Sequence, residues 1–154
     1  MGDQGGIKME LIERNLQKGA YRKIAFEISE PTEEYNFYNY YIYIVLDFIQ
    51  DEEMADDLWL EPVDGTIIPE RPRKMYPYLE NPLLSSLDFH GGITFYSKYF
   101  DSQDRRQIKI GCDYNHLFDQ DRYYNQSEVL EEVKNTIDDF LSQVNYELPD
   151  YLKS

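Results

Sequence analysis

The sequence predicts an α+β fold, in which a small antiparallel sheet of three to four or more strands carries one long C-terminal helix packed on it. Apolar residues alternate with period 2 over 21–29, 88–96 and 107–113, which indicates strands, and residues 126–145 carry an apolar stripe at helical spacing. At 154 residues the chain has the length of one ordinary domain. We therefore expect a disordered N-terminus over 1–7, a single α+β domain over 8–148 and a C-terminal tail over 149–154.

The N-terminal part of the domain is expected to contribute a short helix and two strands. Apolar residues at helical spacing over 8–18 favour the helix, and the alternation over 21–29 favours a first strand. A polar segment over 30–36 that contains Pro31 predicts a turn. The run 37–48 is apolar on both faces, and because such a strand must be covered on both sides, it is placed in the middle of the sheet.

The middle of the chain predicts surface segments followed by a hairpin. The acidic run over 51–57 is typical of a solvated loop or a helix end. Five of the seven prolines lie between Pro62 and Pro82, which predicts a long irregular excursion, and loops of that length are often functional. Strands 88–96 and 107–113 are expected to pair as an antiparallel hairpin around a charged loop at 97–106.

The long helix has a clear beginning and end in the sequence. Asn125 can cap it, with Glu128 reaching back to complete a capping box, and Pro149 stops it. Its apolar stripe, which should face the sheet, comprises Val129, Val133, Ile137, Phe140, Leu141 and Val144. Its acidic residues, which should face water or a partner, comprise Glu128, Glu131, Glu132, Asp138 and Asp139.

The charge and the cysteine content exclude several classes of protein. The net charge is −15, and because residues 1–29 hold five basic and four acidic residues, the other 125 residues carry −16. Such a surface repels a phosphate backbone, so we expect no direct nucleic-acid binding. The acidity either keeps a tyrosine-rich chain soluble or meets a basic protein surface. Cys112 is the single cysteine, which fits a reducing compartment, and it is either a core residue or a thiol served by His116.

No membrane or secretion signal is recognisable. The sequence has no stretch of 18 apolar residues, and its Gly-rich start lacks the charged and apolar regions of a signal peptide. We therefore expect a soluble cytoplasmic protein that makes no contact with a membrane.

The only two histidines, His90 and His116, mark the best candidate site. Strand alternation places His90, Thr94 and Asp113 side by side on one face of the hairpin, while Ile93 and Phe95 join Ile108, Ile110 and Cys112 in facing the core. Gly92 and Gly111 would leave bare backbone on the polar face. Either a ligand or a crossing loop could approach that backbone closely.

Beyond the second strand, Asp113, His116 and Asp119 follow at a spacing of three. In a helical turn they fall roughly on one side, and with His90 they supply two nitrogens and two carboxylates. That set suits a divalent metal such as zinc or manganese, which could activate a water. A small-molecule pocket without a metal and a purely structural turn remain alternatives. We expect His90, Asp113 and His116 to cluster, with Asp119 joining them only if a loop folds back.

The candidate ligand-binding residues are therefore His90, Gly92, Thr94, Gly111, Asp113, His116 and Asp119, and the candidate metal ligands are His90, Asp113, His116 and Asp119.

These two segments resemble a family of small bacteriophage and prophage proteins. The resemblance covers residues 21–144, with a Tyr-rich strand before the motifs and a helix after them. Where the family carries two tryptophans ahead of a glycine, this chain has Ile108 and Lys109, so the resemblance implies no aromatic wall for base stacking at these two positions. The resemblance implies a phage-type origin and no particular reaction. The matching positions are His90, Gly91, Gly92, Ile93, Thr94, Phe95, Gly111, Asp113, His116 and Asp119.

Together these observations favour binding over catalysis. We expect a phage- or mobile-element-type acidic accessory protein of the host-cell cytoplasm that inhibits or sequesters a target, with counter-defence among its roles. The target would be a nucleotide-like small molecule at the His/Asp face or a host protein with a basic surface. A metal-dependent hydrolase or phosphoesterase that uses the same four side chains is the first alternative. A structural or virion-associated protein is the second.

Overall fold

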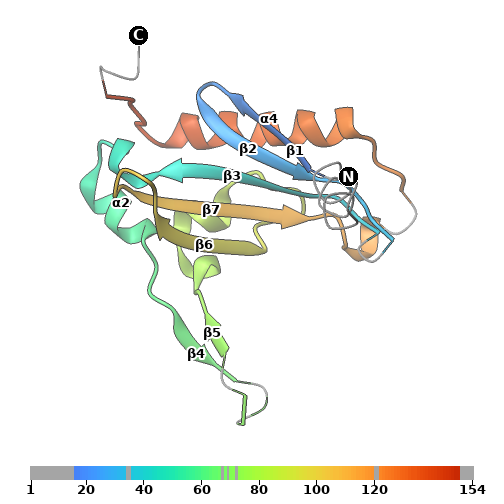
Figure 1. Ribbon diagram of the computed structural model, residues 1–154, viewed down its shortest axis with the longest axis horizontal. Helices are drawn as coiled ribbons and strands as arrows, with labels where there is room; N and C mark the ends of the chain where they lie inside the picture. The colour runs from blue at the N-terminus through green and yellow to red at the C-terminus, as the bar shows by residue number, and fades with distance from the viewer. Residues whose placement is uncertain are drawn as a thin grey trace, which may run out of the picture.

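A five-stranded antiparallel sheet forms the centre of the computed structural model, which describes residues 16–33, 36–66, 68, 70–71, 73–119 and 122–149. The order across the sheet is β1-β2-β3-β7-β6 (Figure 1), so the expected α+β architecture is confirmed. In this spatial order the strands are β1 Leu16–Tyr21, β2 Ile24–Ser29, β3 Asn39–Val45, β7 Arg106–Asp113 and β6 Phe95–Phe100.

The strand that is apolar on both faces, β3, lies in the middle of the sheet, as predicted. The helix α4, Gln126–Gln143, lies along β2 and β3 on one face (Figure 1). Its capping box between Asn125 and Glu128 is present, and it ends two residues before the predicted position. The stripe is buried against the sheet, with Phe140 and Ile137 fully covered. Each such side chain contributes roughly 1.5–3 kcal/mol to stability.

The N-terminal hairpin differs from the expectation. The alternation over 21–29 begins only at β2, because Arg22 and Lys23 both have positive φ (50° and 67°) and form a two-residue turn from β1. Such turns match the twist of the paired strands. Residues 16–18, expected in a helix, belong to β1, since pairing with β2 outweighs a weak helical spacing. Residues 8–15, the predicted disordered residues 1–7 and residues 150–154 of the predicted tail lie outside the described part.

Short elements surround one edge of the sheet. The acidic run forms α2, Glu52–Leu58, which follows η1, Leu46–Phe48, and is capped by Asp51. The irregular excursion predicted over 62–82 is wrong in part, because β4, Val63–Gly65, and β5, Arg73–Met75, pair as a hairpin that projects from the body (Figure 1). The short helices η2, Tyr78–Glu80, and α3, Pro82–Ser86, follow it. None of the helices described is long and apolar enough to cross a membrane.

The second hairpin forms, but its first strand begins and ends later than predicted, and the loop expected over 97–106 is confined to 101–105. Residues 88–94 form a turn in which Gly91 and Gly92 have φ of 68° and 93°, and β6 starts at Phe95. Because this turn breaks the alternation, Tyr96 rather than Phe95 enters the core, where it pairs with Ile110. Phe95 is 38% exposed and packs edge-on against Tyr41. The expected core position of Phe95 is therefore wrong, whereas that of Ile93 is confirmed.

Candidate functional site

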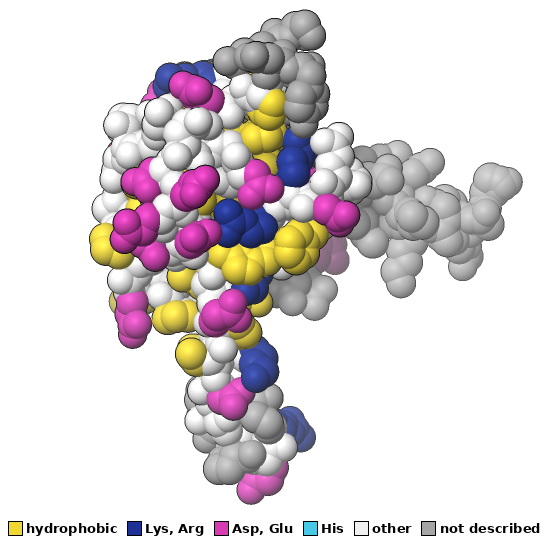
Figure 2. Space-filling view, turned by 90° about the vertical axis from the view of Figure 1, so that its left-hand side faces the viewer, with side chains coloured by type: hydrophobic (Ala, Val, Ile, Leu, Met, Phe, Trp, Pro, Cys, Tyr) yellow, Lys and Arg dark blue, Asp and Glu magenta, His cyan; other side chains and the backbone are white. Residues whose placement is uncertain are grey.

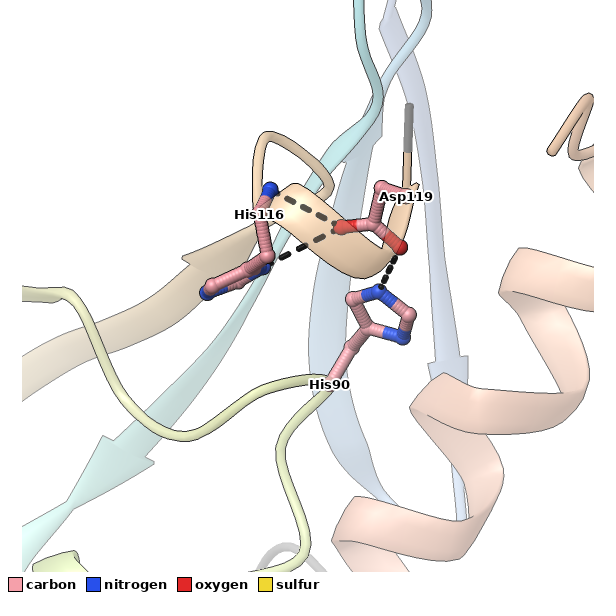
Figure 3. Close-up of side chains that lie close together, drawn as sticks. All are labelled: His90, His116 and Asp119. Atoms are coloured by element: carbon pink, nitrogen blue, oxygen red, sulfur yellow. Dashed lines mark hydrogen bonds and ion pairs between the residues drawn. The ribbon is translucent and has the colours of Figure 1, made fainter. Parts of the chain in front are cut away.

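Three side chains converge at one end of the sheet, next to the start of α4. His90 comes from the turn before β6, and His116 and Asp119 come from the tight turn after β7 that contains η3, Leu117–Asp119 (Figure 3). One ligand-type atom from each of the three lies within 4.8 Å of the other two. The two histidines predicted to share a site therefore do lie together.

Asp119 is the centre of this cluster and is only 6% exposed. Its Oδ1 accepts from the Tyr124 hydroxyl at 2.6 Å and lies 2.8 Å from His90 Nε2. Its Oδ2 accepts from the His116 backbone N–H and lies 3.1 Å from His116 Nδ1. Burial by itself raises the pKa of Asp119, but the hydrogen bonds from Tyr124 and both histidines outweigh it and hold the pKa below its usual value.

His90 is fixed on three sides. Its Nδ1 lies 2.8 Å from Glu132 Oε2 on α4, so each ring nitrogen faces a carboxylate. Its ring stacks on that of Tyr114, with centroids 3.7 Å apart and planes 9° apart. Its backbone N–H donates to the hydroxyl of Tyr40, a core residue of β3. The position of the imidazole is therefore set by the sheet and by α4 together.

Tyr114 links this histidine to the helix. Its hydroxyl donates to the same Glu132 Oε2 that faces His90. Burial, followed by the hydrogen bond to Glu132, raises the pKa of Tyr114 far above its ordinary value, so the phenol stays protonated and continues to donate. Glu132 is thereby aimed at the imidazole of His90.

His116 lies flat against the backbone of the glycine turn. A Cβ at Gly91 would come within 2.5 Å of His116 Cε1, so the imidazole occupies space that a side chain there would need. On its other side the ring stacks on Phe118, with centroids 5.0 Å apart. The side chain of His116 remains 24% exposed, compared with 9% for that of His90. Gly91 is thus required both for its positive φ and for the approach of His116.

Asp113 is at the margin of the site, contrary to the expectation that it would be central. Its Oδ1 lies 4.0 Å from His116 Nδ1, and its carboxylate accepts from the Asn115 backbone N–H and the Thr94 hydroxyl. Thr94 and Asp113 do share a face, but His90 leaves that face because its turn precedes β6. The loop folds back at η3, so Asp119 takes the place expected for Asp113.

Of the two predicted glycines, Gly92 leaves open space beside the backbone and Gly111 does not. A Cβ at Gly111 would lie 2.3 Å from the ring of Tyr41 and 2.4 Å from the carbonyl oxygen of Tyr40, so a neighbouring strand fills that space. Gly111 therefore accommodates the fold and is not an exposed contact, which corrects its place among the candidates. Gly92 has nothing within 4 Å of its Cβ position and stays open.

Three site residues were not predicted from the sequence. Tyr114 and Tyr124 lie in segments where aromatic residues are common, so nothing distinguished them. Glu132 was expected to face water or a partner. In the structure Glu132 lies one helical turn before Thr136, which is buried and shares a 2.8 Å hydrogen bond with Tyr40, so this side of α4 borders the sheet.

An open cleft of about 520 Å³ lies against the cluster. His116 and Asp119 form part of its wall, so the cluster is reached from the cleft. The guanidinium of Arg122 lies 4.6 Å from the ring centroid of Tyr124. Burial and the hydrogen bond to Asp119 raise the pKa of Tyr124 to about 12. The remaining lining residues are aromatic or amide side chains and one proline: Pro31, Asn36, Phe37, Tyr38, Tyr114, Asn115 and Tyr123.

Comparison with known proteins adds no assignment. No protein-family model matches the chain, and the searches of curated proteins and of solved structures return no match either.

Proposed function

We propose that this protein is an acidic accessory protein of phage or mobile-element type that acts by binding a nucleotide-like small molecule in the cleft beside His116 and Asp119. The observation that carries the proposal is the composition of the cleft wall, which combines aromatic rings, two side-chain amides, one guanidinium and one imidazole. Aromatic faces stack on a flat base, amides bind base edges, and a guanidinium binds phosphate.

The positions of the polar groups support a small ligand with few charges. The guanidinium of Arg122 makes an exposed 3.3 Å ion pair with Glu128 and lies over the ring of Tyr124. A phosphate in the cleft can therefore bind it in place of Glu128. The net charge of −15 disfavours a long polyanion but costs a single nucleotide much less, because repulsion grows with the number of phosphates brought near the surface.

A basic host protein is less well supported as the target. Two of the helix acids expected to face it are engaged within the chain, since Asp138 pairs with Arg22 at 2.8 Å and Asp139 accepts from the Asp88 backbone N–H. The exposed acids of α2, among them Glu52 and Glu53, remain accessible. Figure 2 shows the end of the molecule at which α2 lies. Acidic side chains gather on one part of this face, beside basic and hydrophobic ones.

A metal-dependent phosphoesterase is the second candidate function. The convergence of His90, His116 and Asp119 beside the cleft favours it, because two imidazoles and a carboxylate can hold a water-activating ion. It would act on the same class of ligand. Analysis of the nucleotide after incubation separates the two candidates, since a binding protein returns its ligand unchanged and a phosphoesterase releases phosphate.

Calorimetric titration with mononucleotides and the matching nucleosides tests the binding proposal. We expect Arg122→Gln to weaken nucleotide binding about tenfold or more, because a charge-assisted hydrogen bond to phosphate is lost, and to leave nucleoside binding nearly unchanged. Arg73→Gln, in the projecting β5, is the matched control and should change neither. Absence of binding by every mononucleotide, or equal behaviour of the two arginine variants, would overturn the proposal.

A further inference from the structure

We infer that His90, His116 and Asp119 form a mononuclear site for a divalent transition-metal ion, and that zinc fits it best. The inference is independent of any ligand in the cleft, because it rests on side chains that already converge. The donor atoms are His90 Nε2, His116 Nδ1 and a carboxylate oxygen of Asp119, all within 4.8 Å of one another (Figure 3).

The spacing of the donor atoms suits a tetrahedral ion. With zinc–ligand bonds near 2.0–2.1 Å, two ligands of a tetrahedral site lie about 3.3 Å apart. Asp119 Oδ1 lies 2.8 Å from His90 Nε2, Asp119 Oδ2 lies 3.1 Å from His116 Nδ1, and one donor atom from each of the three residues lies within 4.8 Å of the other two, so the side chains must draw inward to surround one ion. The ion takes the place of the two imidazole protons that otherwise point at the carboxylate.

The groups behind the donors are arranged as around known metal ligands. A metal-bound histidine commonly donates its other ring N–H to a carboxylate, which fixes its tautomer and orientation. Glu132 occupies that position at His90 Nδ1, at 2.8 Å, and is itself held by Tyr114. Tyr124 and the His116 backbone N–H orient Asp119 in the same way.

The local charge balance favours a dication. Asp113, Asp119 and Glu132 surround the two imidazoles, and the ion pairs of these carboxylates within the described ranges are with histidine alone. With both imidazoles neutral, as metal ligation requires, the cluster carries three carboxylate charges that form no ion pair with a lysine or arginine of the described residues. A divalent ion offsets two of them.

The donor types select among ions. Two imidazole nitrogens and one carboxylate suit zinc and its neighbours in the first transition series, whereas calcium and magnesium prefer oxygen ligands. Because Asp119 and His116 also line the cleft, the remaining position on the ion opens toward it. Three protein ligands and one open position are the arrangement of reactive zinc sites, as opposed to closed structural ones.

Nitrogen-15 spectra of the histidine rings test the site directly on the wild-type protein. The chain has only two histidines, so both ring systems can be assigned without ambiguity. Titration with zinc alone should shift His90 Nε2 and His116 Nδ1 into the range of metal-bound nitrogens, while His90 Nδ1 stays protonated toward Glu132. Saturation should occur at one ion per chain, and magnesium at the same concentration should leave both rings unchanged.

Affinity measurements on variants complete the test. His116→Gln should abolish stoichiometric zinc binding, and Glu132→Gln should weaken it about 10–100-fold, as expected for a group that orients a ligand. Thr94→Ala is the control, because the Thr94 hydroxyl bonds to the marginal Asp113 and to none of the three proposed ligands, and the variant should retain nearly full affinity. Unchanged ring nitrogens at saturating zinc, or equal zinc affinity in His116→Gln and Thr94→Ala, would overturn the site. The outcome does not depend on whether the cleft binds a nucleotide.

Discussion

The sheet face beneath α4 is held by apolar side chains such as Ile42, Ile110 and Phe140, whereas the end of β7 is held by hydrogen bonds around Asp119 and His90. Apolar burial is nearly indifferent to direction, so many arrangements of similar volume stabilise the same face. The polar cluster has no such freedom, because each donor has one acceptor and a buried group without a partner is costly. The stability of the fold therefore depends mainly on the apolar face beneath α4. The polar cluster at the end of β7 determines where the chemical groups of the site lie.

One residue connects the two regions. Tyr40 is fully buried beneath α4 with the apolar side chains, yet its hydroxyl bonds to Thr136 and receives the backbone N–H of His90. Its ring stacks on Phe89, which immediately precedes His90. Tyr40 thereby holds the turn that carries His90 against the core. A change in core packing is therefore expected to reach the polar cluster through Tyr40.

The largest effect is expected in the apolar region. Phe140→Ala removes a fully buried ring beneath α4 and should lower the free energy of unfolding by about 3–5 kcal/mol. Phe100→Ala is the matched control: that ring is 61% exposed and lies tilted against Trp59, so its removal should lower the free energy of unfolding by about 1 kcal/mol or less. Denaturant unfolding measures both. Similar losses in the two variants would show that α4 does not cover the core as described.

An intermediate effect is expected at the glycine turn, where the two regions meet. Gly91→Ala must accept a positive φ and also displace His116, whereas Gly92→Ala meets only the positive φ because its Cβ position is open. In both variants backbone strain should lower the free energy of unfolding by about 1–2 kcal/mol. Gly91→Ala should lower the free energy of unfolding more than Gly92→Ala does, and it should also shift the ring signals of His116 in NMR spectra. A larger loss in Gly92→Ala would mean that His116 does not lie against this turn.

The apolar region was largely predictable from the sequence because its signals are periodic. The stripe of α4, its capping box at Asn125 and the central position of β3 each follow from spacing alone. The predicted strand bounds and core faces are wrong where the backbone geometry of a turn interrupts the periodic pattern. Positive φ at Arg22 and Lys23 delays the strand predicted over 21–29 until Ile24. Positive φ at Gly91 and Gly92 delays β6, so that Tyr96 enters the core in place of Phe95.

The polar cluster was predictable only in outline. Two rare histidines in glycine-containing segments indicated the place, and the structure does bring His90 and His116 together. The choice between Asp113 and Asp119 depended on a loop that folds back at η3, which no periodic pattern encodes. Glu132 was misplaced because it comes from α4, and a contact between segments so distant in the chain is set by how the helix packs on the sheet.

The smallest expected effect concerns the acid titration of the cluster. The hydrogen bond from Tyr124 helps to hold the pKa of Asp119 below its usual value, so Tyr124→Phe should raise that pKa, as followed by carbon-13 NMR of the carboxyl group. A depressed pKa in the folded state adds stability that is fully present above about pH 4 and is lost as the pH falls through the folded pKa. Wild type should therefore exceed Tyr124→Phe in free energy of unfolding by about 1 kcal/mol near neutral pH, and the difference should shrink in acid.

Phenylalanine keeps the ring of residue 124 against Tyr114 and removes only the hydroxyl, so packing is conserved. A difference that stayed constant from neutral pH into acid would mean that Tyr124 stabilises the fold through its ring alone. If the difference shrinks in parallel with the titration of Asp119, the hydrogen bond from Tyr124 is its cause. Asp119 would then be the anionic centre on which both histidines converge.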